Sequence, residues 1–276
     1  MTETKWFRLR ASAASLVRYL LDSEVHTYAF SVAANAILSF IPFVILLYSI
    51  AKSVFHSSAM ADVIDALVLD FFPSTASSKF WLRLEMVVPS HIKALSLVMI
   101  LISCTGIFLP LEVALNQAWG VTKSRNYVMN QLVAFGLAIL MVILGMGSVL
   151  LSTAQRQVLG FIMFHRTENW FYNGVSNIWM QLCTGIACIL FFFAIYWIMP
   201  NRKVPWRPVL RTSVITGVVW MIAKYIFSAV LPHLDLTSMY GPFYISVGLL
   251  LWAYISGLIL FAGAQFSVKR GLDKGE

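Results

Sequence analysis

Residues 132–153 read LVAFGLAILMVILGMGSVLLST, twenty-two positions without a charged side chain. At about 1.5 Å of rise per residue, a helix of this length spans the roughly 30 Å hydrocarbon core of a bilayer. Five further stretches share this length and character. In chain order the six are Ala29–Ala51, Ala94–Leu115, Leu132–Thr153, Ile178–Met199, Val209–Leu231 and Phe243–Phe266. The sequence therefore predicts an all-α, polytopic membrane protein with six transmembrane helices.

The composition of the whole chain agrees with this prediction. Of its 276 residues, 59% are hydrophobic and only 12% are charged, whereas a soluble protein of this size exposes far more charge. Six spans leave little chain for a soluble domain, so we expect residues 1–276 to form a single membrane domain. Its parts outside the spans are an amphipathic N-terminal segment (1–28), a loop (52–93) and a tail (267–276). The first apolar stretch starts too late and runs too long for a cleavable signal peptide, so we expect it to be retained.

The basic residues predict the orientation of the chain. The net charge is +8, and the chain has twenty Lys and Arg residues. Thirteen of these lie in segments that a six-span topology places on one side, and six lie on the other side. By the positive-inside rule the richer side is cytoplasmic, so both termini are expected in the cytoplasm. The basic excess also suits contact with anionic lipids, and we expect no nucleic-acid partner.

Three amphipathic segments lie outside the predicted spans. Ala11–His26 suits either a helix on the cytoplasmic membrane face or a solvated helix packed on the bundle. In the first outer loop, Met60–Phe71 and Ser77–Val88 each carry an apolar stripe at helical spacing, and Pro73 separates them. We expect two interfacial helices that cover the outer end of the bundle, with a lid over a cavity as the alternative.

The reactive side chains give no sign of a catalytic or metal site. Cys104, Cys183 and Cys188 all fall within predicted spans, which gives no disulfide framework. The histidines are isolated and the acidic residues scattered, whereas metal-dependent phosphodiester cleavage needs clustered ligands. No G-x-S-x-G elbow and no P-loop occurs. The sequence therefore predicts a protein that is not an enzyme, has no cofactor or metal, and is not a ribonuclease.

Ionisable side chains within spans are costly and mark candidate functional positions. Glu112 lies near the cytoplasmic end of the second span, where Arg125, Arg207 or Arg211 could meet it. Lys224 lies about 22 Å into the fifth span, where Asp235 or a tyrosine hydroxyl could reach it. The structural alternatives are a headgroup position for Glu112 and outward snorkelling for Lys224.

Several short motifs occur in an order that resembles a known family. They are Ser39-Phe-Ile-Pro42, Asn116…Trp119…Arg125, Pro200-Asn-Arg-Lys-Val-Pro-Trp206-Arg207, Gly217…Trp220…Lys224…Phe227, Tyr240-Gly241, Trp252…Tyr254 and Gly263-Ala264. Together they resemble the YihY/BrkB family of bacterial inner-membrane proteins, once labelled "ribonuclease BN", from about residue 20 to 268. The resemblance implies a multi-pass protein of the bacterial inner membrane that transports lipid-linked or envelope components. The chain departs from the family pattern at Gln265, where an acidic residue is frequent, and at Asn35, where aromatic residues are common.

Two functions remain open from the sequence. The favoured one is a transporter or flippase of an anionic lipid, an envelope component or another solute. Its candidate translocation residues are polar groups on or beside the spans, namely Lys224, Glu112, Asn116, Asn35, Gln265 and Tyr240. An inner basic rim would attract anionic headgroups and comprises Arg125, Arg202, Lys203, Arg207 and Arg211. The alternative is a non-catalytic scaffold, partnered by a second copy or by an envelope complex, whereas an ion channel lacks a filter motif.

Overall fold

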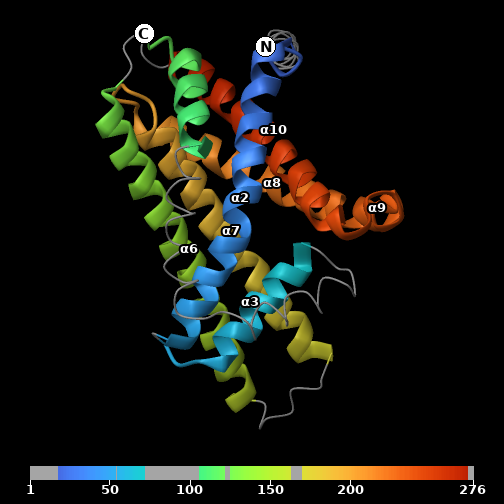
Figure 1. Ribbon diagram of the computed structural model, residues 1–276. Helices are drawn as coiled ribbons and strands as arrows, with labels where there is room; N and C mark the ends of the chain where they lie inside the picture. The colour runs from blue at the N-terminus through green and yellow to red at the C-terminus, as the bar shows by residue number, and fades with distance from the viewer. Residues whose placement is uncertain (1–17, 54, 72–105, 122–124, 163–169, 273–276) are drawn as a thin grey trace, which may run out of the picture.

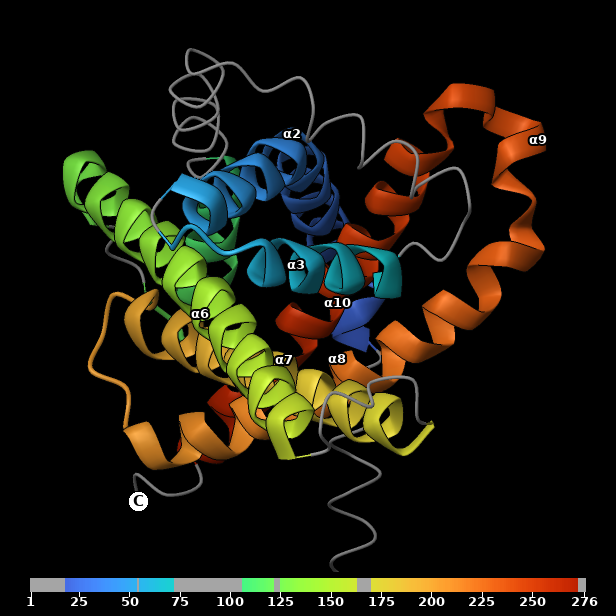
Figure 2. The same ribbon diagram turned by 90° about the horizontal axis from the view of Figure 1, so that it is seen from below.

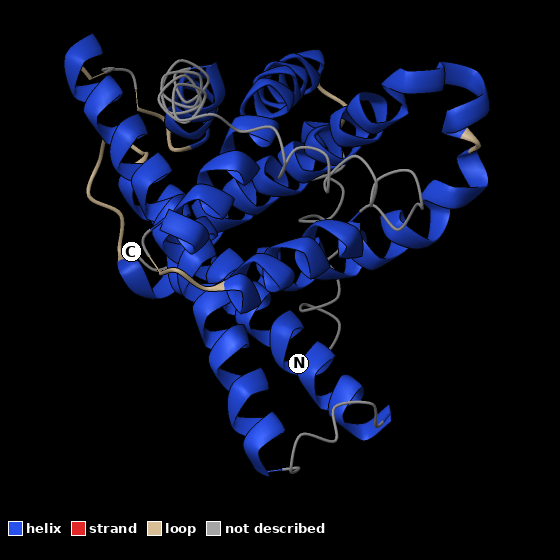
Figure 3. Cartoon of the chain, turned by 60° about the horizontal axis from the view of Figure 1, so that its bottom comes forward, coloured by secondary structure: helices blue, strands red, loops and turns tan. Residues whose placement is uncertain are grey.

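The computed structural model describes residues 18–53, 55–71, 106–121, 125–162 and 170–272. These residues are helical apart from short turns and loops, and none of them forms a strand (Figure 3). Five helices in this part of the chain are long and apolar enough to cross a membrane. They cover Ser23–Lys52, Tyr127–Leu159, Asn173–Ile198, Trp206–Leu234 and Tyr244–Val268. The all-helical prediction is therefore confirmed, together with five of the six predicted spans.

The remaining predicted span, Ala94–Leu115, lies mostly outside the described residues. Its described end belongs to a helix over residues 106–118. The long helices are α2 (Ser23–Ser53), α6 (Tyr127–Ile162), α7 (Trp170–Ile198), α8 (Trp206–Val230) and α10 (Tyr244–Leu272). The main contacts between them are those of the pairs α6–α7, α7–α8, α8–α10 and α10–α2.

Different helix ends and short elements lie at the two ends of this bundle. At the upper end in Figure 1, α2, α6 and α8 begin and α7 and α10 end. At the lower end, α2 and α6 end, α7 begins, and the short helix α3 (Ser58–Phe71) lies beside them. The α8–α10 connection is compact and consists of η1 (Leu231–Leu234), α9 (Leu236–Tyr240) and η2 (Gly241–Phe243). Gly241 has a φ of 53° there, which a residue without a Cβ adopts without strain.

Glycines allow the long helices to approach closely within one chain. A Cβ at Gly257 of α10 would lie 3.4 Å from the Ala29 backbone of α2. A Cβ at Gly217 of α8 would press on Ile189 of α7, and one at Gly263 would overlap Thr216. Because the van der Waals contacts of membrane helices strengthen when small residues bring backbones together, these three glycines serve packing between helices of the same chain.

Helix α3 begins two residues before the predicted Met60–Phe71, lies beside α2 and α6 (Figure 2), and docks through the apolar stripe predicted for it. The stripe packs with buried side chains of α2 and α6, and the cluster comprises Met60, Val63, Ile64, Val44, Leu47, Ala51, Met146 and Val149. The Tyr48 hydroxyl of α2 donates a hydrogen bond to Asp65. Burial raises the pKa of Asp65, because desolvation disfavours the charged carboxylate. The second predicted piece, Ser77–Val88, lies outside the described residues.

The N-terminal amphipathic prediction needs a correction at its C-terminal boundary. Residues 18–20 are helical, but the chain turns at Leu21 and Asp22, and α2 starts at Ser23. The Asp22 carboxylate accepts a hydrogen bond from the Glu24 backbone N–H at 3.2 Å, which is the geometry of an N-cap. The end of the predicted segment Ala11–His26 is therefore the first turn of α2, while residues 11–17 lie outside the described residues.

Candidate functional site

The upper end of the bundle holds a buried polar cluster built on residues 106–118. Glu112 and Asn116 are 4% and 7% exposed, and their spacing of four residues places them on one helical face. The Asn116 Nδ2 donates to Glu112 Oε1 at 3.2 Å. The Asn201 backbone N–H, just beyond α7, donates to Asn116 Oδ1 at 2.8 Å. Asn116 therefore links a buried carboxylate to the segment that joins α7 and α8.

Arg125 connects the same cluster to the end of α7. Its Nη2 donates to the carbonyl oxygens of Ile198 at 3.0 Å and Pro200 at 3.3 Å. Its Nε donates to Asn201 Oδ1 at 3.3 Å, and its backbone N–H donates to the Glu112 carboxylate. A cation at a helix C-terminus satisfies carbonyl groups that have no partner within the helix. Of the three arginines predicted near Glu112, Arg125 lies beside it, although the Arg125 guanidinium donates to the end of α7 and not to the carboxylate.

Arg202 holds the end of helix 106–118 against the α7–α8 connection. Its Nη1 donates to the Trp119 carbonyl oxygen at 3.2 Å, and its guanidinium lies 5.5 Å from the centroid of the Trp119 ring. The ring thus contributes a cation–π contact in addition to the hydrogen bond. Together with Asn116 and Arg125, this contact joins helix 106–118, the start of α6 and the end of α7.

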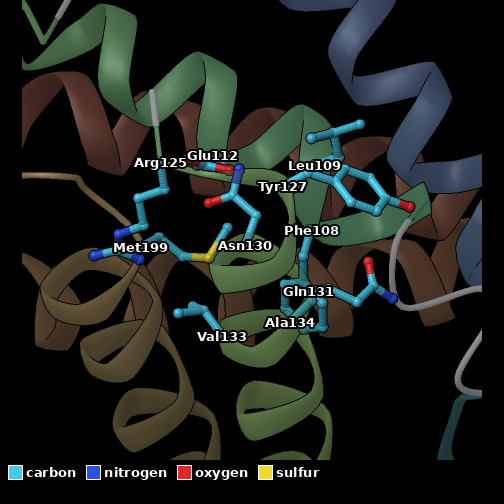
Figure 4. Close-up of a pocket in the computed structure, with 10 residues that line it drawn as sticks. All are labelled: Phe108, Leu109, Glu112, Arg125, Tyr127, Asn130, Gln131, Val133, Ala134 and Met199. Atoms are coloured by element: carbon cyan, nitrogen blue, oxygen red, sulfur yellow. The ribbon is translucent and has the colours of Figure 1, made fainter. Parts of the chain in front are cut away.

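A small pocket opens beside Glu112 (Figure 4). Its walls include Phe108, Arg125, Asn130 and Met199. The Asn130 amide lies beside Glu112, whereas the side chain of Gln131 points away from both. The enclosed space is about 10 Å³, which is room for about one water molecule. This conformation therefore holds no lipid-sized or solute-sized cavity at that position.

Lys224 lies elsewhere, buried between α8 and α7. Its side chain is 1% exposed, so it does not snorkel out of the bundle. Its Nζ donates to Gln181 Oε1 at 2.8 Å and lies 5.1 Å from the centroid of the Tyr225 ring. The observed contact is thus an amide of α7, and Asp235 is exposed in the α8–α10 connection. Lys224 follows the start of α8 by eighteen residues, or about 27 Å, which separates it from the Glu112 cluster.

The other predicted residues do not join either group. Asn35 donates to the Ser31 carbonyl oxygen of its own helix at 2.9 Å. Gln265 is half-buried on α10, and Tyr240 is exposed on α9. The remaining rim residues, Lys203, Arg207 and Arg211, are exposed at the upper end. The structure thus brings together Glu112, Asn116 and Arg125 but not the whole predicted set.

A further buried polar group was absent from the sequence prediction. We call it the α6–α7 polar seam; its members are Ser148, Ser152, Gln155 and Arg156 of α6 and Ser176 of α7. The three serines are 6%, 1% and 3% exposed, in that order. The Arg156 Nη2 lies 3.9 Å from Met180 Sδ of α7. The available signal was the recurrence of polar residues at spacings of four and three across the end of an otherwise apolar stretch.

Comparison with known proteins places the chain in a family. The sequence pattern of the family described as Virulence factor BrkB matches residues 16–274, nearly the whole chain. The protein belongs to the BrkB family. The resemblance seen in the sequence motifs is therefore confirmed.

The relatives of this BrkB-family protein are bacterial and distant. A UPF0761 membrane protein of Pseudoalteromonas atlantica is 22% identical over 84% of this chain and 76% of its own length. Another UPF0761 membrane protein, from Alteromonas mediterranea, is 21% identical over 96% of this chain and 89% of its own length. YfkH of Bacillus subtilis, whose name describes it as ribonuclease-like, is 25% identical over 56% of both chains. No solved structure matches this chain. The family and the apolar helices together identify an integral membrane protein.

Proposed function

We propose that this BrkB-family protein is a transporter or flippase of an anionic lipid or envelope component. The observation that carries the proposal is Lys224, which is 1% exposed on a helix long and apolar enough to cross a membrane. Burying an ammonium group is costly, and an apolar residue of similar volume would fill the position at lower cost. A cation at this depth is therefore better explained by recognition of an anionic group than by packing.

The distribution of charge supports a path between two polar regions. Exposed basic residues surround the upper end, where the Glu112 cluster lies, and they include Arg202, Lys203, Arg207 and Arg211. By the positive-inside rule we assign this end to the cytoplasm of a bacterial inner membrane. Anionic headgroups would concentrate at this rim, and Lys224 would receive the anionic group about 27 Å farther along α8.

The Glu112 cluster would act as the gate at the cytoplasmic end. Its pocket holds about one water molecule, so passage of a headgroup requires the contacts of Asn116 and Arg125 with the end of α7 to open. Such opening is a movement of α7 and α8 relative to helix 106–118, as in other hinge and shear transitions. The same tight packing is the observation that favours the scaffold function, in which the bundle never opens.

Transport can be measured with proteoliposomes that contain fluorescent NBD-phosphatidylglycerol and an external quencher. We expect the wild-type protein to scramble the probe. Lys224→Met should lower the scrambling rate about tenfold or more, since a charge-assisted contact with the anionic headgroup is lost. Lys52→Met is the matched control, because Lys52 is an exposed lysine at the end of α2. A Lys224→Met protein with the wild-type rate would remove Lys224 from the mechanism. A wild-type rate equal to that of protein-free liposomes would favour the scaffold.

A further inference from the structure

The α6–α7 polar seam contains hydroxyl groups that the helix backbone does not satisfy. Thr153 and Thr184 donate to carbonyl oxygens of their own helices, at 2.8 Å to Val149 and 2.9 Å to Met180. Ser148 and Ser152 lie on the same helix as Thr153, and their buried Oγ atoms have no hydrogen-bond partner among the residues that the structure describes. The same is true of Ser176 of α7 and of both polar atoms of the Gln155 amide. Unsatisfied buried polar groups are costly and rare in proteins, so each one needs an explanation.

These groups lie along the contact between two antiparallel helices. Ser148, Ser152 and Gln155 are separated by four and three residues and therefore share one face of α6. Arg156, adjacent to Gln155, reaches Met180 of α7, and α6 and α7 are in contact. Ser176 lies one turn from Met180 on the same face of α7. The seam thus runs for about 12 Å from Ser148 to Arg156, toward the lower end of the bundle.

Two cations flank α7 at this level. Arg156 approaches Met180 from α6, and Lys224 donates to the next residue, Gln181, from α8. Neither α6 nor α7 contains an aspartate or a glutamate. The donors on the seam are serine hydroxyls, an amide NH₂ and a guanidinium, and a guanidinium fork matches the oxygens of a phosphate. Helix α3, which packs on α6 near Val149, carries Asp62 and Asp65, but the donors on the seam itself suit an anion that accepts several hydrogen bonds.

We propose that the α6–α7 polar seam is a binding site for a phosphate group. Arg156 lies three residues, or about 4.5 Å, beyond the end of the uncharged stretch 132–153 and within the apolar helix Tyr127–Leu159, toward the lower end of the bundle. The phosphate would meet Arg156 first, and the hydroxyls of Ser152 and Ser176 would donate to its oxygens as α6 and α7 part. This site rests on the proposed function only in that its phosphate is taken to belong to the transported molecule. Binding of phosphate to the seam can be measured without measuring transport.

A binding role and a structural role predict different effects of one small substitution on ligand binding. Ser152→Ala removes an unsatisfied buried hydroxyl, so it should raise the apparent Tm of the ligand-free protein. If the hydroxyl donates to a phosphate, the same change should also weaken binding. A packing role predicts no change in binding. Ser148→Ala is the companion variant, and exposed Gln157→Ala on α6 is the control.

The test is a binding titration of the purified full chain in detergent by native mass spectrometry. The probes are phosphatidylglycerol, diacylglycerol with the same acyl chains, and inorganic phosphate, the last followed by thermal shift. We expect phosphatidylglycerol to bind about tenfold more tightly than diacylglycerol. Ser152→Ala and Arg156→Gln should reduce this preference, and Gln157→Ala should keep it. Stabilisation by inorganic phosphate that is lost in Ser152→Ala would identify a free anion as the ligand, and a preference confined to the phospholipid would identify a headgroup.

Two results would overturn the site. One is the absence of any preference of the wild-type protein for phosphatidylglycerol or inorganic phosphate. The other is a preference that survives unchanged in Ser152→Ala, Ser148→Ala and Arg156→Gln. If Lys224-dependent flux is then still observed, only the seam is wrong. If the seam binds phosphate but no flux occurs, only the transport proposal is wrong.

Discussion

At the residue scale, Asn35 and Gly106 show how one polar side chain sets the approach of two helices. Asn35 lies on α2, and a Cβ built on Gly106 of helix 106–118 would overlap the Asn35 side chain. The sequence indicated Asn35 as a candidate translocation residue because it adds a polar group midway along the first span. Its place against a glycine, with a hydrogen bond to Ser31, gives it a packing role as well.

This contact predicts a measurable steric coupling. Gly106→Ala should lower the free energy of unfolding by about 1–3 kcal/mol, since an added methyl group in a tight contact forces the helices apart. Asn35→Ala should relieve most of that loss in the double variant. The measurement is thermal unfolding of the four proteins in detergent, analysed as a double-mutant cycle. Additive effects of the two substitutions would show that the residues do not touch.

At the scale of helices, the hydrophobic pattern predicted the long elements well but not their partners. Uncharged stretches of about twenty residues fix where helices lie, because backbone groups in a bilayer must be hydrogen-bonded internally. Nothing in that argument says which faces meet. The apolar stripe of α3 suited an interfacial helix, yet its buried side chains pack on α2 and α6. The seam was missed for the same reason. Serines within a span are tolerated as small residues, and only the packing of α7 against α6 shows that these serines are buried.

The candidate site was predictable only where a local spacing sufficed. Glu112 and Asn116 are four residues apart, so their shared face followed from helix geometry, and Arg125 was near in sequence. Gln181 and Lys224 are 43 residues apart, and their contact depends on how α7 and α8 pack. Arg202 and the Trp119 carbonyl are separated by 83 residues. Contacts of this kind arise from tertiary packing and leave no periodic signal.

Arg125 provides the prediction that belongs to the helix scale. It donates to two carbonyl oxygens at and beyond the end of α7, so Arg125→Ala should fray that end. We expect a loss of about 1–3 kcal/mol in unfolding free energy, the range for hydrogen bonds that involve a charged group. Hydrogen–deuterium exchange should rise at residues 195–201 and stay unchanged elsewhere in α7. Arg211→Ala, an exposed arginine on α8, should change neither quantity, and equal effects of both variants would contradict the capping role.

At the scale of the whole molecule, the orientation follows from charge and helix count together. The basic residues favour a cytoplasmic upper end, and five long helices can place the start of α2 and the end of α10 on one side only if a sixth span crosses between α3 and α6. The described part of that segment, residues 106–118, is helical and meets the start of α6 at the upper end. The predicted topology therefore has two parts, a sixth span between α3 and α6 and a cytoplasmic upper end.

The orientation and the number of spans between positions 126 and 238 can be tested with single cysteines. Cys104, Cys183 and Cys188 are first replaced by alanine, and then Asn126→Cys or Ser238→Cys is introduced, because both positions are exposed. In intact cells a membrane-impermeant maleimide should label Ser238→Cys, between α8 and α10, but not Asn126→Cys, before α6. Lysis should make both accessible, which controls for burial. The reverse pattern would invert the orientation and place Arg156 of the seam toward the cytoplasmic side. Positions 126 and 238 are separated by three long helices, so they must lie on opposite sides if all three cross the membrane. Labelling of both sites in intact cells would therefore contradict the number of spans between them.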